Sequence, residues 1–261
     1  MRSLSVLLFI AVLLAACSST DDSDDITLGW SAEKLFREAK DSINSGAYES
    51  AIKYYEKLEA RFPFGVYAQQ AQLDIAYAYY KQGEDTAALT AIDRFIRLHP
   101  NHSSTDYAWY LKGLVNFKGE LGLFGNVSGQ DMAERDPKAA RDSFTSFRQL
   151  VTNFPESRYV DDAQKRMKYL VNVLASHHVY VSDFYYRRGA YLAAVNRAQK
   201  AITEFPGAPA NEKALYLMIK SYEALGLDDL RGDAARVMST NFPDSKYLKH
   251  GLSADESWWG F

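Results

Sequence analysis

The chain has 261 residues, of which 47% are hydrophobic and 24% charged, and its formal net charge at pH 7 is −3. This weakly acidic balance argues against nucleic acid as a partner, because nucleic-acid-binding domains carry clustered lysine and arginine. The one cysteine, Cys17, excludes an intrachain disulfide, so the fold must be stabilised by the packing of its apolar side chains.

Residues 1–16 have the pattern of a lipoprotein signal peptide. Arg2 provides a positive charge, an almost unbroken apolar run leads to two alanines, and Cys17 comes next. The run is too short to span a bilayer, which favours a cleaved signal over a transmembrane helix. The sequence Leu-Ala-Ala-Cys is similar to a bacterial lipobox, so we predict lipidation of Cys17, and Ser18 favours sorting to the outer membrane. The alternative is an ordinary secretion signal followed by a chance cysteine.

Residues 17–29 are predicted to form a flexible tether, because the segment is polar and acidic and lacks apolar periodicity. Its four aspartates are expected to be solvated, since a calcium site would need ordered carbonyl ligands and a turn glycine among them. At the other end, residues 246–261 are predicted to be a tail that finishes with Trp258, Trp259 and Phe261. These aromatic side chains can fold back onto the last helices or meet a partner or the membrane, and the sequence leaves the choice open.

Regularly spaced glycines and prolines divide residues 30–245 into five units of one kind. Each unit closes at a proline, and the five prolines are Pro63, Pro100, Pro155, Pro206 and Pro243. Four of the units carry a glycine 17 residues before the proline, at Gly46, Gly83, Gly189 and Gly226, while Lys138 takes that position in the third. Self-similarity of this sort is typical of repeat proteins, which present extended binding surfaces.

Apolar residues keep helical spacing on both sides of each glycine. In the first unit they lie at positions 51, 52, 55, 58 and 62, which share one face of a helix. Glycine suits the left-handed residue that closes a first helix, and proline stops a second one. The period of 37 residues from Pro63 to Pro100 is close to that of a tetratricopeptide repeat, about 34 residues.

The spacing therefore predicts an all-α fold, a right-handed superhelical array of about five tetratricopeptide-like helix–turn–helix repeats. The repeats are expected at about residues 30–64, 65–101, 104–156, 158–207 and 210–244. A long loop over 119–135 interrupts the third repeat, and the lack of helix breakers over 158–187 predicts one long helix in the fourth. A generic helical bundle with accidental spacing is the alternative.

Several segments resemble the BamD family, tetratricopeptide lipoproteins of the outer-membrane β-barrel assembly machinery. The similar segments are RFPFGVYAQQAQLDIAYAYYK (61–81), AIDRFIRLHP (91–100), RDP (135–137) and SDFYYRRGAYLAAVNR (182–197). The resemblance runs from the lipobox to about residue 245, and the sequence departs from the family in the loop around 121–131 and in the aromatic C-terminus.

The resemblance implies a non-enzymatic outer-membrane lipoprotein that faces the periplasm, uses no cofactor and helps to recognise, fold and insert β-barrel proteins. Implied partners are the barrel-forming core protein, through its periplasmic domains, other assembly lipoproteins and the C-terminal segments of unfolded outer-membrane proteins. The main rival is a pilus or secretin assembly lipoprotein of the pilotin type. A third possibility, the helical scaffold of a cell-wall lytic enzyme, is disfavoured because no residues remain for a catalytic domain.

The first helix of each hairpin lines the concave face in such repeats, which predicts a surface for substrate peptides. Aromatic side chains there would accept apolar side chains of a final strand, and lysine or asparagine would bind its backbone or its terminal carboxylate. The predicted substrate-binding residues are Phe36, Lys40, Asn44, Leu73, Tyr77, Tyr80, Lys81 and Tyr110. The alternative for each is packing between neighbouring hairpins.

Three arginines are predicted to dock the barrel-forming partner: Arg187, Arg188 and Arg197. The family resemblance implies docking near this turn, and arginine suits carboxylates in interfaces because its planar fork binds them bidentately. A solvated surface is the alternative.

The sequence contains no arrangement typical of a metal site or an active site. His99 and His102 flank a turn, while His177 and His178 are adjacent and face different sides of a helix. There is no serine in a nucleophile elbow and no glycine-rich phosphate loop. We therefore expect neither enzymatic activity nor a cofactor.

Overall fold

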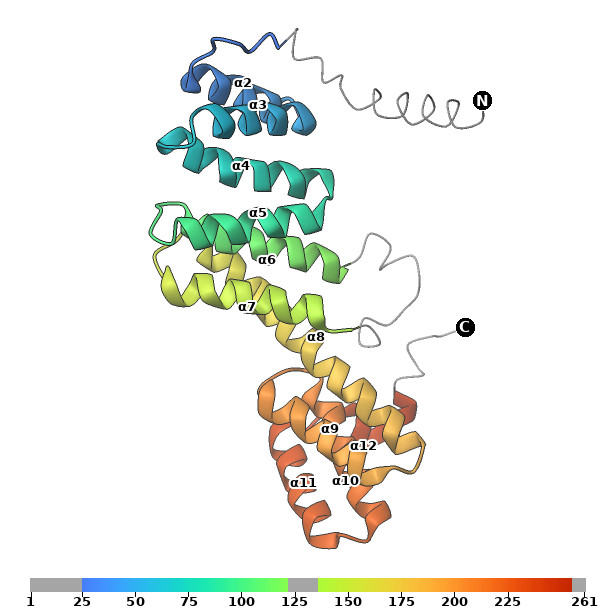
Figure 1. Cartoon of the computed structure of the whole chain (residues 1–261). Coiled ribbons are helices and arrows are strands. Elements are labelled where there is room, and N and C mark those ends of the chain that lie inside the picture. The colour runs from blue at the N-terminus through green and yellow to red at the C-terminus, as the bar shows by residue number, and fades with distance from the viewer. Residues whose placement is uncertain (1–24, 122–135, 255–261) are drawn as a thin grey trace, which may run out of the picture. The chain divides into compact units, whose positions relative to one another are not determined.

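The structure, a computed structural model, describes residues 25–121 and 136–254 (Figure 1). Within these ranges all regular structure is helical, as the sequence predicts. The chain divides into two compact units, residues 1–68 and residues 69–261. The predicted signal peptide and Cys17, most of the loop predicted over 119–135, and the aromatic residues of the C-terminal tail lie outside the described residues.

The first unit contains one helical hairpin, made of α2 (Ala32–Asn44) and α3 (Tyr48–Arg61). The side chain of Ser31 caps α2 by accepting a hydrogen bond from the backbone N–H of Lys34 at 3.2 Å. The two helices bury an apolar seam of Leu35, Ala39, Ala51, Tyr55 and Leu58, all 0% exposed. The hairpin predicted for the first repeat is confirmed.

Residues 25–29 correct the predicted tether, because they form a turn that is bound to α3. The Asp25 carboxylate accepts hydrogen bonds from Lys57 Nζ at 2.6 Å and Arg61 Nη2 at 2.5 Å. Arg61 Nη1 also donates to the carbonyl oxygen of Thr27 at 2.6 Å, and Thr27 is buried. The hydrogen bond from Lys57, followed by those from Thr27, holds the pKa of Asp25 well below its usual range. An aspartate that looked solvated in the sequence therefore fixes the start of the folded chain.

The second unit continues the hairpins in chain order (Figure 1). Its helices are α4 (Val66–Gln82, which begins in the first unit), α5 (Asp85–Leu98), α6 (Thr105–Leu121), α7 (Lys138–Asn153), α8 (Val160–Arg187), α9 (Tyr191–Glu204), α10 (Asn211–Leu225), α11 (Asp228–Asn241) and α12 (Lys246–His250), followed by the 3₁₀ helix η3 (Gly251–Ala254). The long helix of the fourth repeat is confirmed, since α8 has 28 residues. The loop of the third repeat begins later than predicted, because α6 extends to Leu121.

The glycines and prolines act as the sequence predicts. Four glycines adopt positive φ angles between the helices of a pair: Gly46 at 78°, Gly83 at 83°, Gly189 at 74° and Gly226 at 69°. The second helix of each pair ends just before its proline, with C-caps at Phe62, His99, Phe154, Phe205 and Phe242. A residue before proline avoids the α conformation, which explains the shared end point.

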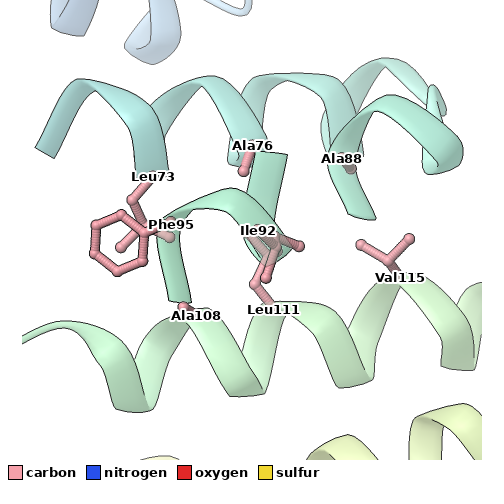
Figure 2. Packing of buried hydrophobic residues seen from close by; sticks show 8 residues of the cluster. All are labelled: Leu73, Ala76, Ala88, Ile92, Phe95, Ala108, Leu111 and Val115. Atoms are coloured by element: carbon pink, nitrogen blue, oxygen red, sulfur yellow. The ribbon is translucent and has the colours of Figure 1, made fainter. Parts of the chain in front are cut away.

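Three successive helices of the second unit meet in one tightly packed core cluster (Figure 2). Leu73 and Ala76 come from α4, Ala88, Ile92 and Phe95 from α5, and Ala108, Leu111 and Val115 from α6; none is more than 1% exposed. Burial of each large side chain contributes about 1.5–3 kcal/mol, and the alanines allow the helices to approach closely. The prediction that Leu73 binds substrate is wrong, because this side chain is sealed inside the core.

Gly113 allows α6 and α7 to approach each other. A Cβ atom added at this position would lie 2.7 Å from Cζ of Phe147 and closer still to two other atoms of the same ring. Phe147 is 0% exposed, so its ring is enclosed by other parts of the protein. The buried hydroxyl of Ser143 also donates to the carbonyl oxygen of Gly113 at 2.9 Å. The third repeat therefore depends on a glycine inside a helix.

Substitution Gly113→Ala should destabilise the protein by about 1–3 kcal/mol, the typical cost of overpacking a core. Gly232→Ala is the matched control: this glycine also lies inside a helix, α11, but an added Cβ would meet nothing within 4 Å. Alanine should be neutral or stabilising there, because it is the better helix former. Urea denaturation followed by circular dichroism measures both variants, and equal stability of the two would contradict this account of α6–α7 packing.

Candidate functional site

In the first unit, the structure brings two of the three predicted substrate residues together. The half-buried Phe36 ring lies 5.7 Å from the ring of Tyr55 and 5.2 Å from that of Tyr67, measured between centroids. The ammonium group of Lys40 lies 6.0 Å from the centroid of the Phe36 ring. Asn44 is the last residue of α2 and is exposed. This unit thus offers a small aromatic group with one adjacent cation.

In the second unit, four tyrosines from three helical segments form what we call the tyrosine cluster: Tyr77, Tyr107, Tyr110 and Tyr159. The Tyr159 ring stacks on that of Tyr110, with centroids 4.6 Å apart and planes inclined by 17°, and lies 5.4 Å from that of Tyr107. Tyr77 lies close enough to Tyr107 to influence its ionisation. Tyr107 and Tyr110 lie one turn apart on the same face of α6, which explains why one ring from the start of α8 contacts both.

The surroundings of Tyr107 and Tyr110 raise the pKa of both phenol groups. Burial, followed by the hydrogen bond to Asp162, raises the pKa of Tyr110 to about 12. Burial and neighbouring side chains, Tyr77 first among them, also raise the pKa of Tyr107. Tyr107 and Tyr110 therefore stay neutral at neutral pH, and the cluster combines aromatic rings with hydroxyl groups, which suits apolar side chains and the polar backbone of a peptide.

An ionic network links the cluster to α8 and limits what Tyr110 can do. The Tyr110 hydroxyl donates to Asp162 Oδ2 at 2.8 Å, and Arg166 Nε donates to the same oxygen at 2.5 Å. Burial alone would raise the pKa of Asp162, but the hydrogen bonds from Arg166 and Tyr110 outweigh it and lower the pKa. Tyr110 thus fastens α6 to α8 with its hydroxyl, and its ring remains as the part that a ligand could touch.

The sequence analysis missed the residues that the start of α8 contributes. The guanidinium carbon of Arg158 lies 4.9 Å from the centroid of the Tyr159 ring. Its Nη2 also donates a hydrogen bond to the Tyr159 hydroxyl at 2.7 Å. Arg166 lies 4.8 Å from the ring centroid of Phe117. The available signal in the sequence was the arginine and tyrosine that follow Pro155. Their contacts with α6 join segments about fifty residues apart in the chain, and helical spacing does not predict such contacts.

The remaining predicted substrate residues lie on α4. Tyr80 is half-buried and packs against the core cluster of Figure 2, as Tyr77 does. Lys81 is exposed in the last turn of α4. Tyr77 and Lys81 are one turn apart, so a peptide lying over Tyr77 would have Lys81 within reach.

Another candidate surface involves α6, α5 and α7. It is a groove of about 410 Å³ whose lining includes Leu89 and Asp93 of α5, Trp109 and Lys112 of α6, and Gln149 of α7. Its charged groups pair with each other, since Lys112 Nζ lies 2.5 Å from Asp93 Oδ1 and Lys138 Nζ lies 2.6 Å from Asp142 Oδ2. The tyrosine cluster, with its aromatic faces and exposed cations, is therefore the stronger candidate for a peptide site.

The three predicted docking arginines have different surroundings. Arg187 donates to Asp183 at 3.0 and 3.2 Å, and Lys213 Nζ donates to the same buried carboxylate at 3.0 Å. Its guanidinium therefore contributes to an ionic group of its own chain.

Arg188 lies instead beside apolar surface. Its guanidinium carbon is 4.5 Å from the centroid of the Phe184 ring. Phe184 is 44% exposed, and Leu192, just beyond the turn, is 64% exposed. Arg197 is half-buried on α9. The sequence analysis missed Phe184 and Leu192, which give the region around Arg188 the apolar character of an interface.

In the described part of the chain, no group of three or more histidine, cysteine, aspartate or glutamate residues could hold a metal ion. No helix in these ranges is long and apolar enough to cross a membrane.

Comparison with known proteins assigns the chain to a family. The family model YfiO, described as an outer membrane lipoprotein, matches residues 30–238. A protein of Neisseria meningitidis serogroup A, named outer membrane protein assembly factor BamD, is 44% identical over 265 residues, which cover 100% of this chain and 99% of that protein. A Vibrio cholerae protein of the same name is 35% identical over 240 residues, covering 92% of this chain and 98% of that protein.

Among solved structures, a crystal structure of MamA protein aligns with 88% of this chain and 96% of that chain, at 16% identity and a TM-score of 0.39, a likeness too weak to support an argument. The description of the family model and the names of the relatives agree with the family resemblance of the sequence. This protein therefore belongs to the YfiO/BamD family of outer membrane lipoproteins.

Proposed function

We propose that this protein is a scaffold of the machinery that assembles β-barrel proteins in the outer membrane. The observation that carries the proposal is the 44% identity, over the whole chain, to a relative named as an outer membrane protein assembly factor. The fold supports it, because an array of helical hairpins presents extended surfaces to other polypeptides. The scaffold has two tasks, which are to receive unfolded barrel proteins and to dock on the barrel-forming partner.

Substrate binding is assigned to the tyrosine cluster together with Tyr80 and Lys81, and in the first unit to Phe36, Lys40 and Asn44. The aromatic rings accept the apolar side chains that alternate along a barrel strand, and hydroxyl groups other than that of Tyr110 bind its backbone. Leu73 is left out, since its side chain is buried. Tyr110 takes part through its ring alone, because its hydroxyl is bound to Asp162.

Docking on the barrel-forming partner is assigned to the surface around Arg188 and Arg197. Arginine and aromatic residues dominate the energetics of protein interfaces, and Arg188 lies on an exposed phenylalanine. Arg187 contributes less, because it is engaged with Asp183. Other assembly lipoproteins are further partners in this proposal.

Attachment to the membrane is assigned to lipid on Cys17, with the helical domain facing the periplasm. Several acyl chains would hold the protein durably, since each buried methylene contributes about 0.8 kcal/mol. Because the turn at residues 25–29 belongs to the folded domain, residues 18–24 are what connects the lipid to it. At roughly 3.5 Å per extended residue, such a segment keeps the first unit within about 25 Å of the anchor.

The double substitution Tyr77→Ala with Lys81→Ala should weaken binding of a C-terminal strand peptide about tenfold, because it removes an aromatic surface and a cation from the proposed site. Fluorescence anisotropy with a labelled peptide measures the change, and circular dichroism checks that helicity is retained. Tyr216→Ala with Lys220→Ala removes the same residue types at the same spacing on α10 and should leave peptide affinity unchanged. Unaltered affinity of the first variant, with unaltered helicity, would contradict the assignment.

Charge reversal of the docking surface, Arg188→Glu with Arg197→Glu, should reduce co-purification of the barrel-forming partner about tenfold or more. The reason is that a carboxylate would replace a cation at each position that faces the partner. Arg141→Glu, an exposed position on α7, makes the same change of charge away from this surface and is the control. Co-purification at the wild-type level by the double variant would overturn the docking assignment.

A further inference from the structure

Arg158 differs from Arg166 and Lys112, because no carboxylate lies within ion-pair distance of its guanidinium group, although Asp106 is near enough to help raise its pKa after the hydrogen bond to Tyr159. Arg166 is paired with Asp162, and Lys112 is paired with Asp93. Among the ion pairs of the described chain, none includes Arg158, and its side chain is exposed. The protein therefore presents a guanidinium group to solvent at the edge of an aromatic surface.

Two of the nearby carboxylates, Asp106 and Asp162, are already bound to other groups. Asp106 accepts hydrogen bonds from the Ser157 hydroxyl at 2.7 Å and from the backbone N–H of Tyr107 at 2.7 Å. Asp162 accepts from Tyr110 and Arg166. Asp161, in the first turn of α8, is exposed. These negative charges would repel a doubly charged anion such as phosphate more than a single carboxylate, so the surroundings favour a monovalent ligand.

The Tyr159 ring holds Arg158 in position. The guanidinium lies over this ring, one Nη2 N–H group is directed to the Tyr159 hydroxyl, and the ring is itself stacked on Tyr110. A guanidinium has five N–H donors in a fixed fork, so one bond to Tyr159 leaves an edge that can bind a carboxylate bidentately. Because the supporting ring is packed, less side-chain freedom is lost when a ligand binds.

We propose that Arg158 binds the terminal carboxylate of a peptide whose last side chain is aromatic and lies against the tyrosine cluster. The carboxylate and the side chain of a terminal residue are attached to one carbon atom, so their binding sites must adjoin. Arg158 and the rings of Tyr159 and Tyr107 provide such adjoining sites. The inference rests on the proposed function, because the peptide is the end of an unfolded barrel protein, and it makes Arg158 a residue that selects chain ends over internal segments.

The test uses the full mature lipoprotein in detergent micelles and three fluorescein-labelled peptides of ten residues. All three alternate apolar and polar residues; one ends in phenylalanine with a free carboxylate, one in phenylalanine carboxamide and one in alanine with a free carboxylate. Fluorescence anisotropy measures each affinity at low and at physiological salt. The wild-type protein should bind the phenylalanine carboxylate about tenfold more tightly than either of the others, a preference typical of one charge-assisted or aromatic contact.

Variants then assign the carboxylate preference to one residue. Arg158→Gln should bind the carboxylate and the carboxamide peptides equally, and Arg158→Lys should retain part of the preference because it keeps the charge without the fork. Arg148→Gln is the matched control, since Arg148 is also exposed and also lies over an aromatic ring, 5.8 Å from that of Phe144. It should keep the full preference.

The outcomes separate this inference from the proposed function. A preference that survives in Arg158→Gln, or a wild-type protein that binds the carboxylate and carboxamide peptides equally, overturns the role of Arg158 and leaves substrate binding by the cluster intact. Failure of the wild-type protein to bind any of the three peptides would contradict the proposed substrate surface itself. Loss of the preference in Arg158→Gln alone supports the inference.

Discussion

Close approach of neighbouring helices through small side chains is the constraint on which the rest of this structure depends. Ala76, Ala88 and Ala108 allow three helices to share one core, and Gly113 lets the Phe147 ring lie directly against the α6 backbone. The chain has no disulfide to compensate for poor packing. Each hairpin is therefore stabilised by short helix-to-helix distances, which small residues make possible.

The same constraint explains where the candidate binding surfaces lie. The fully buried residues shared by α4, α5 and α6 are alanine, leucine and other apolar side chains without a tyrosine, whereas the seam of the first hairpin does bury Tyr55. Tyr77, Tyr107 and Tyr159 pack at the edges of the core clusters and are half-buried. Phe184 and Leu192 are more exposed still. A tightly packed array thus displays aromatic surface that other polypeptides can bind.

Features set by local sequence were predictable, and features set by distant contacts were not. The hairpins, the left-handed glycines and the length of α8 follow from helical spacing and from the stop signals of glycine and proline. The same helical spacing led to the prediction that Leu73 lies on the ligand-binding surface, although its side chain is buried against α5 and α6. Asp25 binds to α3 and Tyr159 packs against α6, and both contacts join segments that are far apart in the chain. The periodic spacing of apolar residues does not predict such contacts.

The central claim is that this lipoprotein is part of a barrel assembly machine, and its stable partners test that claim most directly. The measurement is affinity purification of the lipidated protein from solubilised membranes of the cell that makes it, followed by mass spectrometry of the proteins retained. The account predicts retention of a barrel-forming outer-membrane protein with periplasmic domains. A pilus or secretin subunit as the sole stable partner would contradict it.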